Sequence, residues 1–259
     1  MRKTVGTIIA ITNEKGGTGK TTMAVNLGAA LAIRGMKTLV IDMDPQGNAS
    51  YILSQITETD PAMYATLVEK DTALEAIIQT TGVENLDIAP SNLHLAGAEV
   101  QLATMFGREN ALKRKLPPEL VNRYEFLLID TSPSLGLLTI NALNAADYAL
   151  IPVSCDFLSL VGLTLLFDTI RLCQEQLGSH VKVLGLVANR YDRRERVSLE
   201  VLNALKEQFN SLLFETIVRV NVRLKESPSY RQVIYQYDPV CAGAKDHLAL
   251  ANELIRKVE

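Results

Sequence analysis

The feature that most constrains this chain is a glycine-rich loop placed between a strand pattern and a helix pattern. The apolar, β-branched run TIIAIT (7–12) predicts a buried strand, and KTTMAVNLGAALAIRG (20–35) predicts a helix. Between them stands NEKGGTGKTT (13–22), whose glycines let backbone N–H groups approach an anion at the positive end of the helix. This arrangement predicts a phosphate-binding loop.

The loop keeps the end of the usual pattern G-x-x-x-x-G-K-[ST] and departs from its start. We expect Lys20 to reach the β- and γ-phosphates of a nucleotide and Thr21 to ligate Mg²⁺. Glu14 stands where the pattern has its first glycine, and Lys15 is a second lysine. Three interpretations are open for Lys15: a solvated surface lysine, a second phosphate contact in the same chain, or a contact to the nucleotide of a second subunit.

Strand and helix patterns alternate along the chain. Further strand candidates lie at 37–42, 86–90, 126–131, 148–153 and 181–189, and helical patterns lie at about 92–115, 135–146, 158–176, 196–209 and 243–258. Such alternation predicts an α/β fold, a mostly parallel sheet with helices on both faces. Ligands of such sheets bind at the carboxyl ends of the strands, where the motifs of this chain fall.

Two carboxylate motifs follow strand candidates. Asp42 and Asp44 in VIDMDPQGNAS (40–50) are spaced i, i+2, so both side chains are expected to face one crevice. Asp130 follows the apolar run FLLI and has the pattern of a Walker B carboxylate, which faces Mg²⁺ or its water shell. The alternatives are a turn formed by Asp44 and its neighbours and a strand that ends in a capping Asp130.

KGGTGKTT (15–22) resembles the deviant Walker A motif of the ParA/MinD family of ATPases. The resemblance implies a deviant Walker P-loop NTPase fold in which Lys15 acts across a nucleotide-sandwich dimer, with Lys15 and Lys20 both contributing to catalysis. The loop residues that it places on ATP are Lys15, Gly16, Gly17, Thr18, Gly19, Lys20, Thr21 and Thr22.

The two carboxylate motifs share this resemblance. DMDPQGN (42–48) is similar to the family's switch I, which implies that Asp44 orients the attacking water and that Asp42 supports the magnesium shell. The stretch from Asp130 is similar to switch II, although Ser132 stands where the family usually has a proline. The metal site implied in this way consists of Thr21, Asp42 and Asp130.

The C-terminal third resembles the family more loosely. Asn189, at the end of a strand candidate, is placed on the adenine ring by the resemblance, with a local turn as the alternative. The segment 218–239 is similar to one that family members place near the base and the dimer edge, with Arg219, Val220 and Ser227 replacing the usual proline, arginine and alanine. Phosphate contacts to duplex DNA are expected from Arg193, Arg194, Arg219 and Arg223.

An ordinary solvated charged face is the alternative for these arginines. The net charge of −3 argues against a protein coated in positive charge but not against a local basic patch. A further basic run, KRK (113–115), is interpreted as the end of a helix.

Composition narrows the class and the compartment. The chain has 259 residues, and we expect one ATPase domain over 1–259, without a helix-turn-helix because the first strand begins near residue 7. Three widely spaced cysteines suit neither a disulfide framework nor a metal cluster, so we expect free thiols and a cytoplasmic protein. The sequence contains no apolar run of about 18 residues, so we expect no membrane-spanning helix. Paired cysteines and a tyrosine-rich tail, which iron–sulfur relatives and bacterial tyrosine kinases need, are missing from the sequence.

The expected function is that of a small ParA/Soj-type partition ATPase. It would bind ATP with Mg²⁺, dimerise around ATP, bind duplex DNA without sequence preference on the nucleoid, and hydrolyse ATP weakly until a ParB-type partner stimulates it. Its cargo would be a plasmid, a chromosome or a protein complex. The alternative is a MinD-like membrane-associated positioning ATPase, which needs an apolar amphipathic tail. The final residues ANELIRKVE lack aromatic bulk, so we expect the last helix to pack on the core.

Overall fold

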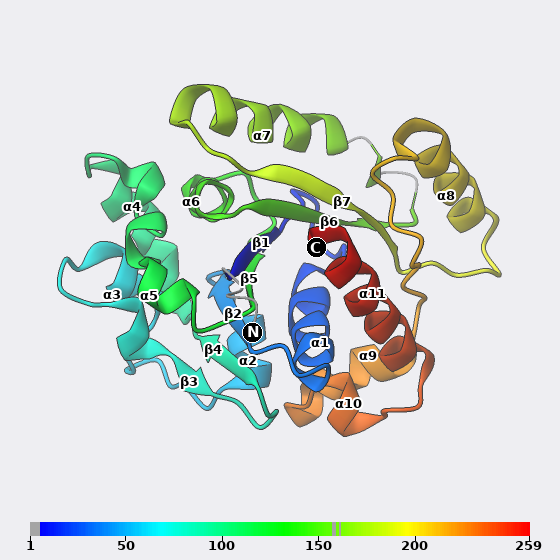
Figure 1. The fold of residues 1–259 in the computed structure, drawn as a ribbon, viewed down its shortest axis with the longest axis horizontal. Coiled ribbons are helices and arrows are strands. Elements are labelled where there is room, and N and C mark those ends of the chain that lie inside the picture. The colour runs from blue at the N-terminus through cyan, green and yellow to red at the C-terminus, as the bar shows by residue number, and fades with distance from the viewer. Residues whose placement is uncertain (1–5, 157–158, 161) are drawn as a thin grey trace.

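A seven-stranded sheet forms the centre of the computed structural model, which describes residues 6–156, 159–160 and 162–259 (Figure 1). The strands are β1 (Thr7–Ile11), β2 (Thr38–Met43), β3 (Gln79–Thr80), β4 (Leu86–Ala89), β5 (Phe126–Thr131), β6 (Tyr148–Ser154) and β7 (Lys182–Asn189). Their order is β3-β4-β2-β5-β1-β6-β7, and every neighbouring pair is parallel except β3 and β4. The predicted mostly parallel sheet is therefore confirmed.

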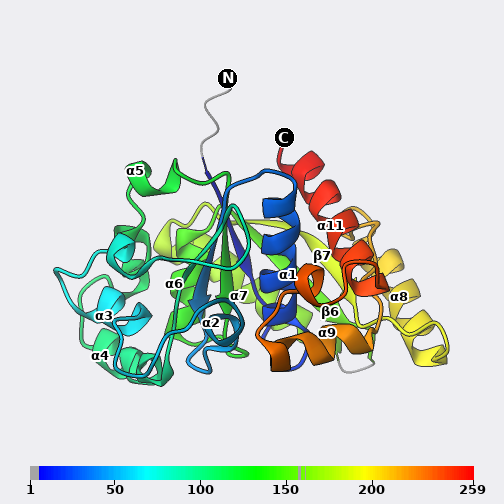
Figure 2. The ribbon, with the colours of Figure 1, turned by 90° about the horizontal axis from the view of Figure 1, so that it is seen from below.

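Helices cover both faces of this sheet. The longer helices are α1 (Lys20–Ile33), α6 (Leu137–Ala145), α7 (Leu163–Leu177), α8 (Arg196–Phe209) and α11 (Ala242–Val258). The shorter helices are α2 (Asn48–Leu53), α3 (Met63–Val68), α4 (Ala98–Ala103), α5 (Pro118–Val121), α9 (Val222–Glu226) and α10 (Ile234–Tyr237). Helices α1 and α11 lie on one face and α6 and α7 on the other (Figures 1 and 2).

Burial on both faces explains why the strands read as unbroken apolar runs. On β1, Ile8 and Ala10 pack in the core on the α6 and α7 side, whereas Ile9 and Ile11 pack in the core formed with α1 and α11. The last helix contributes Leu250 and other apolar residues to this second core. The prediction that the last helix packs on the core is confirmed. None of the helices in the described ranges is long and apolar enough to cross a membrane.

The prediction of one helix over about 92–115 is wrong. The chain there forms α4 between short 3-10 turns at Leu93–Gly97, Arg108–Asn110 and Lys113–Lys115. The side chain of Asn141 on α6 donates to the carbonyl of Arg108 (2.8 Å) and accepts from the N–H of Leu112 (3.1 Å). In a continuous helix these two backbone groups would hydrogen-bond to each other, whereas here both bond to the Asn141 amide. Gly107, with φ of 61°, turns the chain just before them.

The run KRK (113–115) is accordingly a separate 3-10 turn rather than the end of a helix. Lys115 Nζ donates to three backbone carbonyls of a neighbouring loop, those of Glu69, Lys70 and Thr72. The helix predicted over 158–176 appears as α7, and residues 157, 158 and 161 of that region lie outside the described residues. The predicted free thiols are confirmed for Cys155, Cys173 and Cys241.

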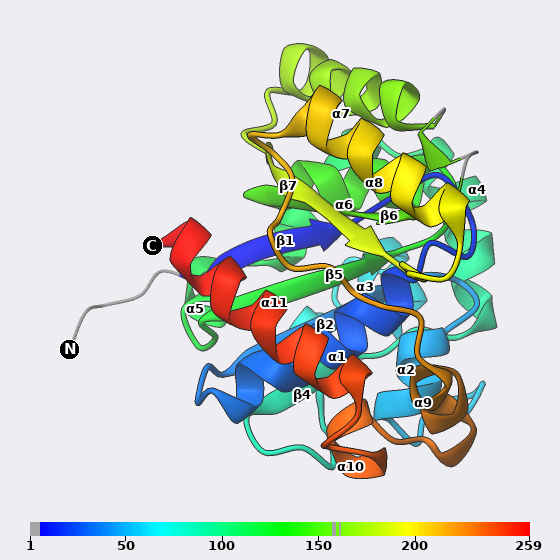
Figure 3. The same cartoon turned by 90° about the vertical axis from the view of Figure 1, so that its right-hand side faces the viewer.

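Two carboxylates on α11 hold the irregular segment 212–220 beside β7 (Figure 3). Glu253, which is only 4% exposed, accepts from the N–H groups of Glu215 and Thr216, both at 2.8 Å. Two turns earlier, Asp246 accepts from the N–H of Arg219 at 3.0 Å. The segment in turn pairs with β7, and β7 ends at the predicted nucleotide site.

We expect Glu253→Ala to lower the free energy of unfolding by about 2–4 kcal/mol, because two backbone N–H groups lose a buried charged acceptor. Chemical denaturation followed by circular dichroism measures the loss. Glu207→Ala, which removes an exposed carboxylate from α8, is the control and should change stability by no more than about 0.5 kcal/mol. Equal stabilities of the two variants would contradict this account of α11.

Candidate active site

The parallel register brings the ends of three strands to one edge of the sheet. Ile11 at the end of β1 is level with Asp130 on β5, and Asp130 is level with Asp42 on β2. The hydroxyl of Thr131 donates to the carbonyl of Ile11 at 3.0 Å and ties the ends of β5 and β1 together. The phosphate-loop candidate and both carboxylate motifs therefore lie side by side, as strand order predicts for parallel sheets.

The loop from 13 to 20 is held from inside by its own lysine. Lys20 is 6% exposed, and its ammonium donates to the carbonyls of Asn13 (2.8 Å) and Lys15 (3.2 Å). Gly17 and Gly19 have φ of 75° and 86°, a region that side chains with a Cβ rarely adopt. The loop then opens into α1, whose first N–H groups are available to an anion.

The end of β7 supports the loop from outside. The side-chain amide of Asn189 donates to the carbonyl of Thr18 at 2.6 Å, and Arg190 Nη1 donates to the carbonyl of Gly17 at 2.7 Å. A Cβ at Gly19 would lie 2.5 Å from Asn189 Nδ2, so this close approach requires glycine. Asn189 is thus at the site, as predicted, but here it contacts the loop, and its contact with adenine stays a prediction.

Asp42, Asp44 and Asp130 are all buried at this edge of the sheet, and the charges of Asp130 and Asp44 act on the Lys20 ammonium. Asp42 is fully buried and accepts from the Ser50 hydroxyl (2.6 Å) and the Ser50 N–H (2.8 Å), yet burial raises its pKa to about 6. Burial and the neighbouring charge of Asp42 raise the pKa of Asp130 well above its usual value. Burial lowers the pKa of Lys20, while Asp130 and Asp44 act in the opposite direction. Three acidic groups thus lie near one ammonium, and a cation bound among them would favour their ionised forms.

The residues present fit Mg²⁺ bound together with phosphates. Both carboxylate oxygens of Asp130 are buried and lack a hydrogen-bond partner among the described residues, which suits a position next to a cation and its water shell. No three His, Cys, Asp or Glu side chains in the described part of the chain converge on one metal position. Phosphate oxygens, water and the Thr21 hydroxyl would complete the six ligands that Mg²⁺ prefers.

Lys15 lies apart from Lys20 and is bound by a different element. Its ammonium forms an ion pair with Asp156, beyond the end of β6, and donates to the Ser159 hydroxyl at 3.0 Å. Partial burial raises the pKa of Asp156, but hydrogen bonds from Lys15, Ser154 and Ser159 outweigh it and lower the pKa. The side chain of Lys15 is 30% exposed, so the interpretation as a freely solvated surface lysine does not describe this structure.

The predicted DNA-binding arginines lie on two adjacent segments, because Tyr191 and Arg219 form a parallel bridge. Three of the four are ion-paired within the chain: Arg194 with Asp192 (2.5 Å), Arg219 with Asp246 (2.6 Å), and Arg223 with Glu226 (2.9 Å) and Asp238 (3.4 Å). Arg193 is exposed, and within the described ranges no carboxylate forms an ion pair with it. DNA contact by these side chains remains a prediction, and Arg193 is its best test.

Several residues at the site were missed by sequence reasoning. Thr131, Asp156 and Arg190 come at or within two residues of a strand end, and Ser50 lies in the first turn of α2. The rule that ligands bind at the carboxyl ends of parallel strands would have indicated the first three. Ser50 carried no such signal, since its contact with Asp42 depends on how α2 folds back.

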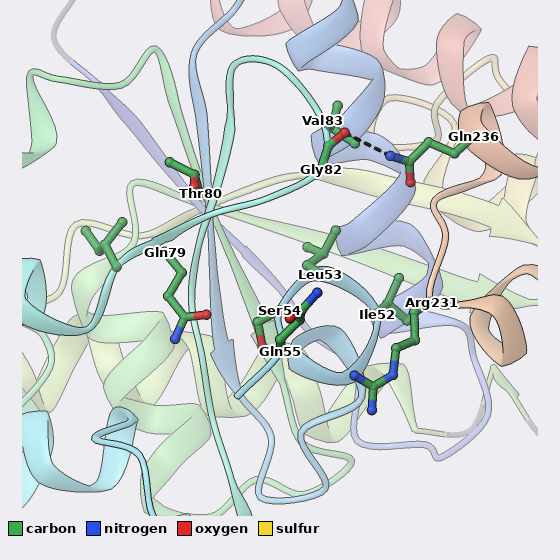
Figure 4. Close-up of a pocket in the computed structure, with 11 residues that line it drawn as sticks. Ile52, Leu53, Ser54, Gln55, Gln79, Thr80, Gly82, Val83, Arg231 and Gln236 are labelled. Carbon is green, nitrogen blue, oxygen red and sulfur yellow. Dashed lines mark hydrogen bonds between the residues drawn. The ribbon is translucent and has the colours of Figure 1, made fainter. Parts of the chain in front are cut away.

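A hollow of about 710 Å³ lies behind α2 and is separate from the loop (Figure 4). Its rim includes Arg231, whose guanidinium stacks 4.5 Å from the ring centroid of Tyr51, and Gln236, whose amide donates to the carbonyl of Gly82 at 2.9 Å. None of residues 13–22 lines it. The site for a nucleotide is therefore defined by the loop and the strand ends and not by this hollow.

Comparisons with known proteins agree with this geometry. A protein-family profile described as AAA domain matches residues 6–183. The sporulation initiation inhibitor protein Soj of Bacillus subtilis is 43% identical over 251 residues, which cover 96% of this chain and 98% of Soj. The chromosome-partitioning ATPase Soj of Treponema pallidum is 40% identical over 98% of both chains.

A solved structure adds the fold-level comparison. The crystal structure of cobyrinic acid a,c-diamide synthase from Mycobacterium smegmatis, with bound ATP analogue and magnesium, is 30% identical and superposes with a TM-score of 0.84. The match covers 97% of this chain and 95% of that one. From the extent and the level of identity to the curated relatives, the protein belongs to the Soj/ParA family of chromosome-partitioning ATPases.

Proposed function

We propose that the protein partitions or positions cargo as an ATP-dependent dimer that binds duplex DNA without sequence preference. ATP and Mg²⁺ are its cofactors, and its reaction is the hydrolysis of ATP. The observation that carries the proposal is the separation of the two loop lysines. Lys20 is buried beneath the loop, whereas the ammonium of Lys15 is held by Asp156 beyond the end of β6.

Within one subunit, the loop and the two switches would each contact a different part of the bound nucleotide and metal. The N–H groups of Gly16 to Gly19 and the start of α1 would hold the phosphates, with Lys20 as their cation. Mg²⁺ would bridge phosphate oxygens and neutralise the charge that develops during hydrolysis. Thr21, Asp42 and Asp130 are assigned to the metal and its water shell. Asp44, only 6% exposed, is assigned to the attacking water.

Lys15 is assigned to the second subunit. Its ammonium contacts Asp156, whereas the Lys20 ammonium lies beneath the loop. This separation supports neither a phosphate contact of Lys15 within its own chain nor a purely solvated Lys15. In a dimer joined face to face at the loops, this lysine would reach the γ-phosphate of the partner. ATP would then stabilise the dimer, and hydrolysis would release it.

DNA binding would depend on this dimer. Each phosphate contact lowers the logarithm of the affinity by about 0.9 for every tenfold rise in salt, so a monomer with few contacts binds weakly in cells. Two copies double the contacts that Arg193 and its neighbours offer. The ATP-bound dimer would lie on the nucleoid, and a ParB-type partner is proposed to stimulate hydrolysis and so release the protein from the DNA. The packed last helix gives no support to the MinD-like alternative.

We expect Lys15→Gln to leave ATP affinity within about threefold of wild type and to weaken ATP-dependent dimerisation at least about tenfold, or ~1.4 kcal/mol. The reason is that the ammonium serves the partner's nucleotide and not its own. Calorimetry measures binding, and light scattering with a slowly hydrolysed ATP analogue measures dimer formation. Lys37→Gln, the same charge change at the opposite end of β2, should dimerise normally. A Lys15→Gln protein that dimerises like wild type would remove the cross-subunit role.

Arg193→Glu is expected to weaken ATP-dependent binding of random-sequence duplex DNA. It should reduce the salt slope by about 2 units, because each dimer loses two phosphate contacts. Arg123→Glu, an exposed arginine at the amino end of β5, is the matched control. Arg219→Glu is unsuitable, since it would place a carboxylate against Asp246 and disturb the fold. DNA retardation that Arg193→Glu leaves unchanged would reject the patch, and recruitment to anionic liposomes instead of DNA would favour the MinD-like function.

A further inference from the structure

A buried serine pair connects switch I to the turn after β4. Ser91 donates its N–H to the Ser50 hydroxyl at 2.7 Å, and its own hydroxyl donates to the carbonyl of Asp44 at 3.0 Å. Both serines are 1% exposed. Because Ser50 in turn donates to Asp42, the two aspartates of switch I are tied to a single point outside switch I.

The backbone geometry of switch I is adapted to this contact. Gly47 has φ of 61°, and a Cβ there would lie 3.2 Å from the carbonyl oxygen of Ser91. Its N–H donates to the carbonyl of Asp44 at 2.9 Å, so that carbonyl accepts from both Gly47 and Ser91. The backbone of Asp44 is thus held by two donors, and its carboxylate accepts separately from the Gln46 N–H at 3.0 Å.

Eight residues after Ser91, the same segment reaches switch II. The carboxylate of Glu99 on α4 accepts from the N–H of Leu138 in the first turn of α6, at 3.4 Å. Glu99 Oε1 lies close to the Cα of Gly136, where a Cβ would displace the carboxylate from this position. Helix α6 has no acidic residue in its first turn and no side-chain cap of its own. Glu99 therefore supplies from another element the negative charge that the start of a helix favours.

We propose that residues 91–99, which we term the bracket, couple the two switches. Ser91 is a positioning residue for Asp44, and Glu99 is a positioning residue for the start of α6. A displacement of switch I on nucleotide binding would pass through the buried serine pair to the bracket and from there to switch II. The proposal rests on the assignment of Asp44 to the attacking water under the proposed function.

The physical reason is the narrow geometry that hydrolysis requires. A misplacement of about 1 Å in a catalytic or water-positioning group can cost about 100-fold in rate. Loss of the Ser91 hydroxyl would leave the Asp44 carbonyl with the Gly47 N–H as its remaining donor, so the backbone that carries the Asp44 carboxylate and the Gln46 N–H would be held less firmly. Nucleotide binding, which depends on the loop, should persist.

Single-turnover hydrolysis by Ser91→Ala tests the positioning role. We expect a rate about tenfold lower than wild type, equivalent to ~1.4 kcal/mol of activation free energy, with ATP affinity within about twofold. The matched control is Ser54→Ala, which removes a buried hydroxyl that donates to the Ser50 carbonyl at 2.8 Å without touching either aspartate. Both variants should lose similar stability to denaturant, and only Ser91→Ala should lose rate. Equal rates in the two variants would overturn the role of Ser91.

A double-mutant cycle tests the coupling. If the bracket is one unit, Ser91→Ala and Glu99→Ala combined should slow hydrolysis by less than the product of their separate effects. Glu99→Gln, which keeps an acceptor oxygen but loses the charge, should have a rate between those of wild type and Glu99→Ala. Independent, multiplicative effects would overturn the bracket. Asp44→Ala separates the two levels of the account, because normal turnover in that variant would contradict the proposed function itself.

Discussion

The register between β1, β5 and β2 is the constraint on which the site depends. It places Asp42 and Asp130 on adjacent strands and brings the loop after β1 against them. Three carboxylates and one ammonium are then buried together, with pKa values of Asp42 and Asp130 displaced upward by burial. Charges buried in this way are stable only with compensating partners. A shift of one residue in this register would turn these side chains to the other face and remove the site.

Much of this arrangement could be predicted from the sequence, because local patterns determine it. The apolar runs that became β1, β2 and β5 are buried on both faces, and the glycines at 17 and 19 adopt positive φ as a phosphate loop requires. Asp42 and Asp130 lie at the carboxyl ends of β2 and β5, and Asp44 directly follows β2. Each of these motifs stands next in sequence to the strand or helix that positions it, so propensity and periodicity were sufficient to predict where it lies.

Contacts between distant segments could not be predicted. The helix expected near 92–115 is broken by amides of Asn141 and Asn144 on α6, more than thirty residues away in sequence. Arg219, which was predicted to contact DNA, forms an ion pair with Asp246, 27 residues later, and this pair links the segment beside β7 to α11. The pairing of Lys15 with Asp156 spans 141 residues. In each case the two partners are distant in sequence and adjacent only in the folded structure.

In the proposed dimer, Lys15 of one subunit completes the site of the other, and this can be tested by mixing two inactive variants. Lys15→Gln keeps its own ATP site but lacks the crossing lysine, whereas Lys20→Ala loses ATP binding but keeps Lys15. Mixed dimers would contain one complete site, formed by Lys20 of the first variant and Lys15 of the second. The account predicts that ATP hydrolysis by the mixture exceeds that of either variant alone. If mixing restores no hydrolysis, Lys15 does not act across the dimer.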